Sequence, residues 1–361
     1  MAIITPQFEI RIQTQTGKKY MVPVVESIRV NTSRKVEPDT ATIKIPSIRG
    51  LELDTFKKGD EVQILFGHKN SDYGLKKVFL GMISKIGPNF PVIIEAKDWW
   101  WVIKKTWYKD EDAKLPAANL SASLNYIAQE LINNPGDGAE GLEGVELITS
   151  SDYDSVEFHG EFPIGTRNYG AVFDDLLKHG WDLFIIPGTK KLWFGPRDNL
   201  VIAYPHQPMT PIFKSGLNII DPGLDYESSS GIRKVEVWIE GKERKPKDPD
   251  GKYEPEDADK NGETLKFDIP GIKKSSEYGP DWYAKLLYDI NSKKGLSGHF
   301  RTFGLGYFQH WMKCKLEVGL GGRMIDWHCF PSGIDYVYSP SDGFKMDIHF
   351  ENSREGGALA V

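Results

Sequence analysis

The chain has 361 residues, 40% of them hydrophobic and 27% charged, which indicates a folded globular protein of two or three domains. Its formal net charge of −6 argues against a general nucleic-acid binder, because such proteins depend on a basic surface. Two cysteines are too few for a disulfide-dense secreted scaffold, and neither a signal peptide nor an apolar run of about 18 residues is expected here.

The first hundred residues alternate apolar and polar side chains in short runs, which predicts strands. The predicted strands are 8–13, 20–25, 24–31, 40–46, 61–66, 77–86 and 92–97. Polar, glycine-containing turns separate the last three strands, as in an antiparallel meander that makes half of a small curved barrel. Gly81 lies inside the second strand of this meander and predicts a bulge or bend there. Residues 1–104 are therefore predicted to form one β-domain.

Three consecutive tryptophans, Trp99 to Trp101, follow the meander. In extended backbone successive side chains point to opposite faces, so the three cannot all enter one core. We expect at least one to be buried against the next unit of the chain or against a neighbouring subunit, which favours oligomerisation. The alternative is that the three tryptophans form a carbohydrate-binding platform together with Trp107 and Tyr108. A second aromatic group, Tyr307, Phe308 and Trp311, is open to the same interpretation.

Residues 105–215 change to a mixed pattern and are predicted to form an α/β unit. Apolar residues at helical spacing predict a helix from about Leu120 to Ile132, which ends at an Asn-Asn-Pro-Gly stop. A second helix is predicted over 169–178, between a strand at 145–149 and a hairpin at 181–194.

Residues 216–361 return to β structure and are predicted to form a second β-domain. Its predicted strands are 224–226, 233–240, 265–269, 299–302, 311–318, 333–338 and 344–350. The segment 241–263 is charged and low in apolar residues, which predicts an exposed, mobile loop. Residues 281–294 carry an apolar stripe typical of a helix.

The order of these pieces carries a resemblance to a known family. Three short motifs follow one another. The first is an entry motif with Asp54, Phe56, Gly59, Asp60 and Val62. The second is a Phe-x-Gly-x-Ile strand with Phe79, Gly81 and Ile83, and the third is a strand that ends in Ala96, Lys97 and Asp98. Together with the downstream pattern, they resemble the baseplate hub proteins of contractile phage tails and phage-like injection systems, the late control protein D family. Type VI spike proteins share this tail-hub fold in their N-terminal part.

The resemblance implies a β-dominated α+β fold in which two similar small β-barrel (tube) domains flank an α/β unit. It implies a structural, non-enzymatic role: a homotrimer with pseudo-six-fold symmetry that joins the hexameric tail tube to the trimeric spike and leaves a channel for DNA or effectors. The implied partners are a spike or needle protein, a tube or tube-initiator protein and other baseplate (wedge) proteins. The implied location is the virion tail baseplate or an injection particle, assembled in the bacterial cytoplasm. Because the sequence ends at Val361, where members fused to a spike continue, a separate spike is expected.

No catalytic, cofactor-binding or metal-binding residue is predicted. His310, Cys314, His328 and Cys329 are the only metal-like group, but the adjacency of the last two fits no common zinc pattern and favours buried thiols. Asp248, Asp250 and Gly251 place glycine too early for a calcium loop. Gly-rich segments at 304–306 and 319–322 are interpreted as turns, and no serine lies in a nucleophile elbow.

Two alternative functions stay open at this point. One is a carbohydrate-binding or cell-wall-active tail-tip protein that uses the tryptophans. Cleavage of a glycosidic bond would need a pair of catalytic carboxylates, and no pattern in the sequence selects such a pair. The other is the tail-tip hub of a non-contractile tail.

The negative net charge of the chain also suggests that a bore through the ring would let DNA slide without sticking.

Overall fold

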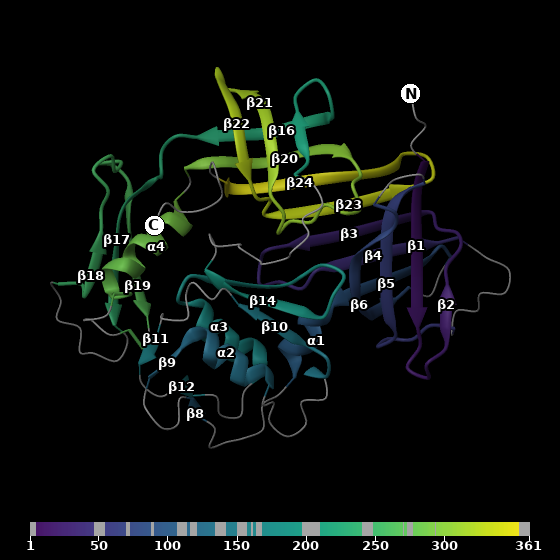
Figure 1. Cartoon of the computed structure of the whole chain (residues 1–361), viewed down its shortest axis with the longest axis horizontal. Helices are drawn as coiled ribbons and strands as arrows, with labels where there is room; N and C mark the ends of the chain where they lie inside the picture. The colour runs from purple at the N-terminus through teal and green to yellow at the C-terminus, as the bar shows by residue number, and fades with distance from the viewer. Residues whose placement is uncertain are drawn as a thin grey trace.

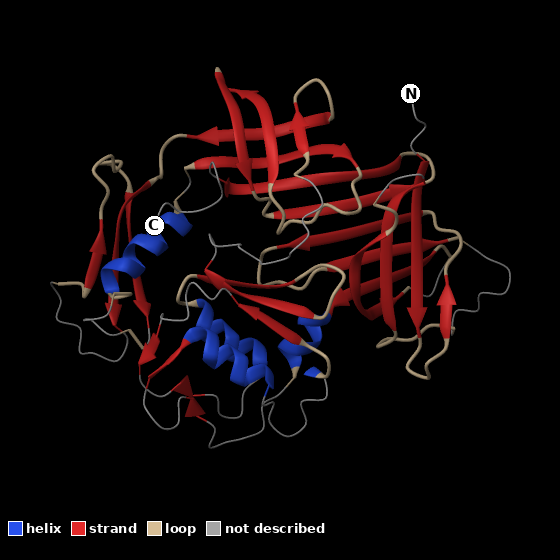
Figure 2. Cartoon of the chain, in the orientation of Figure 1, coloured by secondary structure: helices blue, strands red, loops and turns tan. Residues whose placement is uncertain are grey.

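The computed structural model describes residues 5–46, 55–69, 73–87, 90–106, 114–115, 121–133, 142–149, 157–159, 162–163, 168–196, 210–239, 248–269, 271–272, 277–292 and 294–353. Strands dominate this part of the chain, which holds four helices (Figure 2). None of the helices in these ranges has the length and apolar character that crossing a membrane requires.

One sheet of eleven strands runs through the molecule and joins the two ends of the chain (Figure 1). In spatial order its strands are β16 (Ile219–Glu227), β20 (Gly295–Phe303), β24 (Gly343–Ser353), β23 (Gly333–Ser339), β3 (Ser27–Ser33), β4 (Thr40–Ile45), β7 (Val92–Asp98), β6 (Lys76–Ile86), β5 (Glu61–Lys69), β1 (Thr5–Gln13) and β2 (Lys19–Met21). Every neighbouring pair in it is antiparallel. The first and last segments therefore form one continuous layer.

Smaller sheets and the helices are arranged around this layer. The strands are β8 (Lys114–Leu115), β9 (Ser121–Ser123), β10 (Glu146–Thr149), β11 (Glu157–His159), β12 (Phe162–Pro163), β13 (Trp181–Ile185), β14 (Lys191–Pro196), β15 (Ile212–Lys214), β17 (Ile232–Ile239), β18 (Gly251–Tyr253), β19 (Glu263–Ile269), β21 (Cys314–Leu320) and β22 (Arg323–Cys329). The helices are α1 (Trp99–Lys105), α2 (Leu124–Asn133), α3 (Tyr169–Leu177) and α4 (Pro280–Asn291). In Figure 1, α1 to α3 lie beside the β10–β14–β13 sheet, and α4 lies beside β17–β19.

The buried apolar side chains form two clusters. The first unites β1 and β3–β7 with β20–β24, so that Phe66 of β5 stacks on Phe344 of β24 with ring centroids 4.5 Å apart. The second unites the middle unit with α4 and β17, where Tyr283 of α4 contacts the buried His179 after α3. Burial of these surfaces supplies the main driving force for folding.

The predicted elements of the meander are confirmed as β5, β6 and β7. The predicted helices at 120–132, 169–178 and 281–294 correspond to α2, α3 and α4, whereas β15 and β22 were not predicted. Gly81 is not itself a bulge, because the register shifts lie near Val78 and Ser84; instead, a Cβ at Gly81 would stand 2.1 Å from the carbonyl oxygen of Lys97.

A β-dominated fold is confirmed, but two closed barrels are not, since the first and last segments share one sheet and one core. The division into units at 1–104, 105–215 and 216–361 stays a prediction. The loop predicted at 241–263 is wrong at Gly251–Tyr253, which pairs with β17 as β18, and at Glu263, which begins β19; residues 254–262 are loop and turn. Residues 240–247 lie outside the described part.

Candidate assembly surface

The side chains that face away from the first cluster include one row that crosses all eleven strands, here called the polar row. In a sheet, directly opposed residues on neighbouring strands point to the same face. Following these partners from edge to edge gives Lys19, Gln13, Glu61, Met82, Lys97, Thr40, Asn31, Asp335, Asp347, Arg301 and Asp221. All but Met82 are polar; at β6, Met82 and Leu80 on the same face pack against the second apolar cluster.

Opposite charges in and beside the polar row lie close together. Arg301 donates two hydrogen bonds to Asp347, at 2.7 and 2.8 Å, which is the bidentate geometry of a strong charge-assisted pair. Arg29, on the same face of β3, donates to Asp335 at 2.6 Å, and Asn31 also donates to that carboxylate. The row contains four carboxylates and three cationic groups, so it is close to charge-balanced rather than basic.

The surroundings of Asp335 control its ionisation. Burial alone would raise the pKa of this carboxyl, but the nearby His349, whose Nε2 lies 3.8 Å away, the hydrogen bonds from Arg29 and Asn31 and the charge of Arg29 hold the pKa at about 2. Asp335 is therefore ionised at neutral pH and serves as a fixed acceptor at the centre of the sheet.

The joint between β3 and β23 connects the first and last segments of the chain. Six residue pairs align antiparallel from Ile28 and Tyr338 to Ser33 and Gly333. The Thr32 hydroxyl adds a hydrogen bond of 3.2 Å to the carbonyl of Ile334. Two β segments that are far apart in sequence thus meet edge to edge through backbone hydrogen bonds.

The outermost strands of the eleven-stranded sheet, β16 and β2, carry exposed apolar side chains. Near the β16 edge these side chains are Leu217 just before β16, Ile220 within β16 and Phe303 at the end of β20. Leu217 is 75% exposed. At the opposite edge Met21 is 65% exposed, with the exposed Val24 close behind it in sequence. Unpaired strand edges and exposed apolar residues are both features of surfaces that bind another chain.

The predicted metal-like group is only partly brought together. Cys314 and Cys329 are directly opposed on β21 and β22, with their Sγ atoms 4.0 Å apart, and both are buried free thiols. His328 is exposed on the other face of β22, as the adjacency of the two residues predicted. His310 is buried, with Nδ1 3.4 Å from the Thr32 hydroxyl, and burial lowers its pKa to about 3. Across the ranges that the structure describes, no three His, Cys, Asp or Glu side chains are gathered as a metal site.

The tryptophans at 99–101 are helical rather than extended, because Asp98 caps the first turn of α1 by accepting a hydrogen bond from the N–H of Trp101. Trp99 and Trp100 enter the second cluster, which confirms the expected burial against the middle unit. Trp101 is half-buried, and the Lys105 ammonium lies 4.0 Å from its ring centroid. Trp107 and Tyr108 lie outside the described residues.

The other candidate groups have structural roles. Phe308 and Trp311 are buried, and Tyr307 packs on Tyr73. The Asp250 carboxylate accepts a hydrogen bond of 3.0 Å from the N–H of Ile239, where it stabilises the chain between β17 and β18. Within the segment 319–322, Gly321 and Gly322 form the β21–β22 turn with positive φ angles, whereas Gly319 and Leu320 are the last residues of β21.

Neither the polar row nor the β3–β23 joint was predicted from the sequence. Both depend on register between strands that lie up to about three hundred positions apart, and no local pattern specifies that register. The available signal was weaker: several of these strands, such as β3 and β4, alternate polar and apolar residues, which shows that one face is polar but not which strands are neighbours.

Comparison with known proteins finds similar folds among solved structures only. No protein-family model matches the sequence, and no curated protein matches it either. Among solved structures, the 43 kDa tail protein of prophage MuSo2 from Shewanella oneidensis has a TM-score of 0.63 at 12% identity, with 97% of each chain covered. The tail protein from Neisseria meningitidis MC58 has a TM-score of 0.60 at 12% identity, with 98% of each chain covered.

A component of the type VI secretion system of E. coli, itself structurally similar to tail proteins of bacteriophage T4, has a TM-score of 0.54 at 7% identity. This match covers 98% of the present chain and 78% of the other. At such low identities the likeness concerns the fold. The chain has a fold similar to that of these phage tail proteins and of this type VI secretion component.

Proposed function

We propose that the chain is a structural hub protein of a phage tail baseplate or of a phage-derived injection system. Three copies would close into a ring with pseudo-six-fold symmetry, which joins a hexameric tail tube to a trimeric spike. The fold supports a tail or baseplate role, and the trimeric ring and its channel are the specific content of the proposal.

The observation that carries the proposal is the β3–β23 joint. It shows that β segments of this chain pair edge to edge, and it leaves β16 and β2 as the two free ends of the sheet. A ring of identical subunits needs head-to-tail contacts between two different surfaces of each copy. In the proposed ring, the β16 edge of one copy meets the β2 and β1 edge of the next, and the exposed apolar side chains at both ends are buried there.

The polar row suggests how the ring would treat a passing polymer. We propose that this face of the sheet lines the bore, because the opposite face is occupied by the apolar core. Its paired charges leave few unneutralised cations to bind phosphates, and non-specific DNA binding depends on such cations. A polyanion would therefore slide along the bore without strong adhesion.

The partners of the hub follow from the same proposal. They are the trimeric spike or needle on one face of the ring, the tube or tube-initiator protein on the other, and further baseplate proteins around it. The assembled location is a virion tail or an injection particle, formed in the bacterial cytoplasm.

The test is the solution mass of the purified chain by light scattering, with negative-stain images of the same fraction. The wild type is expected at three times the chain mass of 40.8 kDa, as ring-shaped particles. The double variant L217K/I220K should fold but give single subunits, because charges at the β16 edge oppose burial. Tyr126→Lys, at an exposed aromatic residue of α2 away from both edges, is the matched control and should keep the ring.

The proposal fails if the wild-type chain stays a monomer at high concentration, both alone and when it is co-expressed with the spike protein that a neighbouring gene encodes. It also fails, in its choice of interface, if Tyr126→Lys breaks the ring as effectively as the edge variant.

A further inference from the structure

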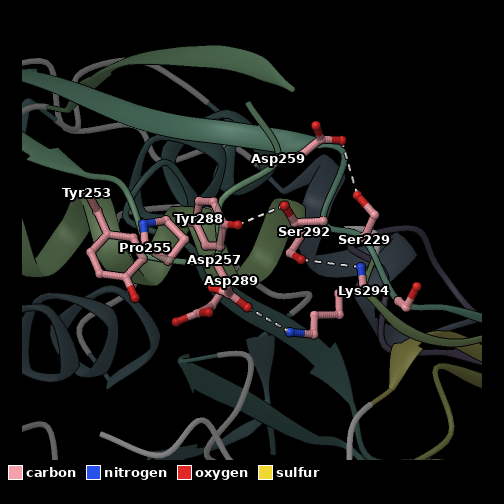
Figure 3. A pocket seen from close by; sticks show the side chains of 11 residues that line it. Ser229, Tyr253, Pro255, Asp257, Asp259, Tyr288, Asp289, Ser292 and Lys294 are labelled. Carbon is pink, nitrogen blue, oxygen red and sulfur yellow. Dashed lines mark hydrogen bonds and ion pairs between the residues drawn. The ribbon is translucent and has the colours of Figure 1, made fainter. Parts of the chain in front are cut away.

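A pocket of about 380 Å³ opens in the unit formed by β17, β18, β19 and α4 (Figure 3). Its lining comes from four parts of the chain: the serine run before β17, the segment from β18 to Asp259, the C-terminal end of α4 and Lys294. This volume lies within the range of small-molecule sites, about 300–1,000 Å³. The pocket is large enough for one or two sugar rings.

Hydrogen bonds in the folded chain fix the walls of the pocket. The buried Tyr288 donates its hydroxyl hydrogen to Ser230 at 2.7 Å, and Ser230 donates in turn to the carbonyl of Ile232 at 2.7 Å. Tyr253 packs edge to face on Tyr288, with ring centroids 5.3 Å apart. Because these contacts connect α4, β17 and β18, the pocket is largely preformed.

The polar lining offers both acceptors and donors. At one side of the pocket, the ammonium Nζ of Lys294 lies 3.4 Å from the carboxylate Oδ2 of Asp257. Asp289 lies beside this pair in Figure 3. At another side Ser229 donates to Asp259 at 3.3 Å. The half-buried ring of Tyr253 adds an apolar surface.

This combination selects a class of ligand. Three carboxylates against one lysine disfavour a polyanion, and the described carboxylates are not gathered closely enough to form a metal site. Lys294 disfavours a simple cation. A neutral polyhydroxyl molecule can donate to the carboxylates, accept from the lysine and hydroxyls, and lay its C–H face on an aromatic ring. We propose that the pocket binds a short neutral saccharide, as a second function beyond the structural role.

The experiment is saturation-transfer difference NMR on the full chain, with maltose, N-acetylglucosamine and its β-1,4-linked disaccharide as probes. At least one saccharide is expected to receive saturation from the protein, and titration should give a dissociation constant in the millimolar range or below. The double variant D257N/D289N should weaken that affinity about tenfold or more, because it alters acceptors for sugar hydroxyls. Glu256→Gln, at an exposed neighbour that does not line the pocket, is the control and should keep the wild-type affinity.

Further arms make the result decisive. Insoluble chitin and starch, tested by co-sedimentation, distinguish a free sugar from a polysaccharide as the source of the ligand. If the double variant does not fold, Asp257→Asn alone carries the test, because 76% of that side chain is exposed. Absence of saturation transfer to all three saccharides overturns the proposal. So does binding of spermidine in place of the sugars, which would assign the pocket to a cationic ligand.

Discussion

The guanidinium of Arg29 lies 2.6 Å from the carboxylate of Asp335, although the two residues stand 306 positions apart in the chain. They lie diagonally across the joint between β3 and β23, and the same carboxylate also accepts a hydrogen bond from Asn31. One acidic side chain therefore ties the first segment of the protein to the last, at the centre of the polar row.

Replacing Asp335 with alanine should weaken this joint. The change leaves Arg29 and Asn31 without their shared acceptor, and hydrogen bonds to charged groups contribute about 1–3 kcal/mol each. Urea unfolding should show a loss of that order in the free energy of unfolding. Lys85→Gln is the control, because the Lys85–Glu95 pair is exposed and should contribute about 0–1 kcal/mol. Equal losses in the two variants would contradict a special role for the joint.

The same carboxyl predicts sensitivity to acid. Its pKa is about 2 in the folded protein, below the value of about 3.9 for an ordinary aspartate. The folded state therefore holds this proton less tightly than the unfolded chain, and the stabilisation is present above pH 4 and lost as pH falls towards 2. Melting temperatures measured from pH 5 to pH 2.5 should fall less steeply in Asp335→Asn than in the wild type. Parallel slopes would contradict the assignment.

Asp98 predicts the opposite pH dependence. Burial raises its pKa to about 7, and hydrogen bonds from backbone N–H groups only partly counter this effect. The folded state therefore holds this proton more tightly, so the stabilisation is complete below pH 4, falls as pH rises to about 7 and stays constant above. Asp98→Asn keeps a capping oxygen and removes a charge that acts on the buried Asp39, so the variant should be more stable than the wild type at pH 8, by a larger margin than at pH 5. Urea unfolding at pH 5 and pH 8 checks this, and a variant less stable than the wild type at pH 8 would refute it.

Trp100 should be the most sensitive of the three consecutive tryptophans. It is fully buried, and its indole N–H donates to the carbonyl of Val36 at 2.6 Å. Trp100→Ala should cost about 3–5 kcal/mol of unfolding free energy through the cavity that it leaves. Trp100→Phe keeps an aromatic ring but leaves the Val36 carbonyl unpaired, which costs about 1–3 kcal/mol. Trp101→Ala, at the half-buried neighbour, should cost less than either, and the reverse order would contradict the packing described.

Gly81 tests the close approach of β6 and β7. A Cβ there would stand 2.1 Å from the backbone oxygen of Lys97, so Gly81→Ala must separate the two strands. We expect a loss of about 1–3 kcal/mol, typical of overpacking. Gly319→Ala is the matched control, because its Cβ would meet only Met324 Sδ at 3.6 Å, an ordinary contact. Thermal unfolding of both variants distinguishes steric conflict from a general effect of replacing glycine in a strand.

Local sequence determined much of the secondary structure. The β5–β6–β7 meander and helices α2, α3 and α4 follow from side-chain periodicity and turn residues, which act within a few positions. Two predictions failed for different reasons. The polar segment Gly251–Tyr253 becomes a strand because the distant β17 supplies its hydrogen bonds, which overrides local pattern. The tryptophans begin a helix because of a local signal that was overlooked, the cap that Asp98 provides.

The sequence by itself thus determined most of the longer strands, the helices α2, α3 and α4, and which face is apolar in the strands that alternate. Only the tertiary structure decided that β3 pairs with β23, that one sheet and one core unite the two ends of the chain, and that polar residues align from Lys19 to Asp221. The physical reason is range. Periodicity reports which side of a strand is buried, whereas the choice of a partner strand and its register depends on contacts between residues hundreds of positions apart.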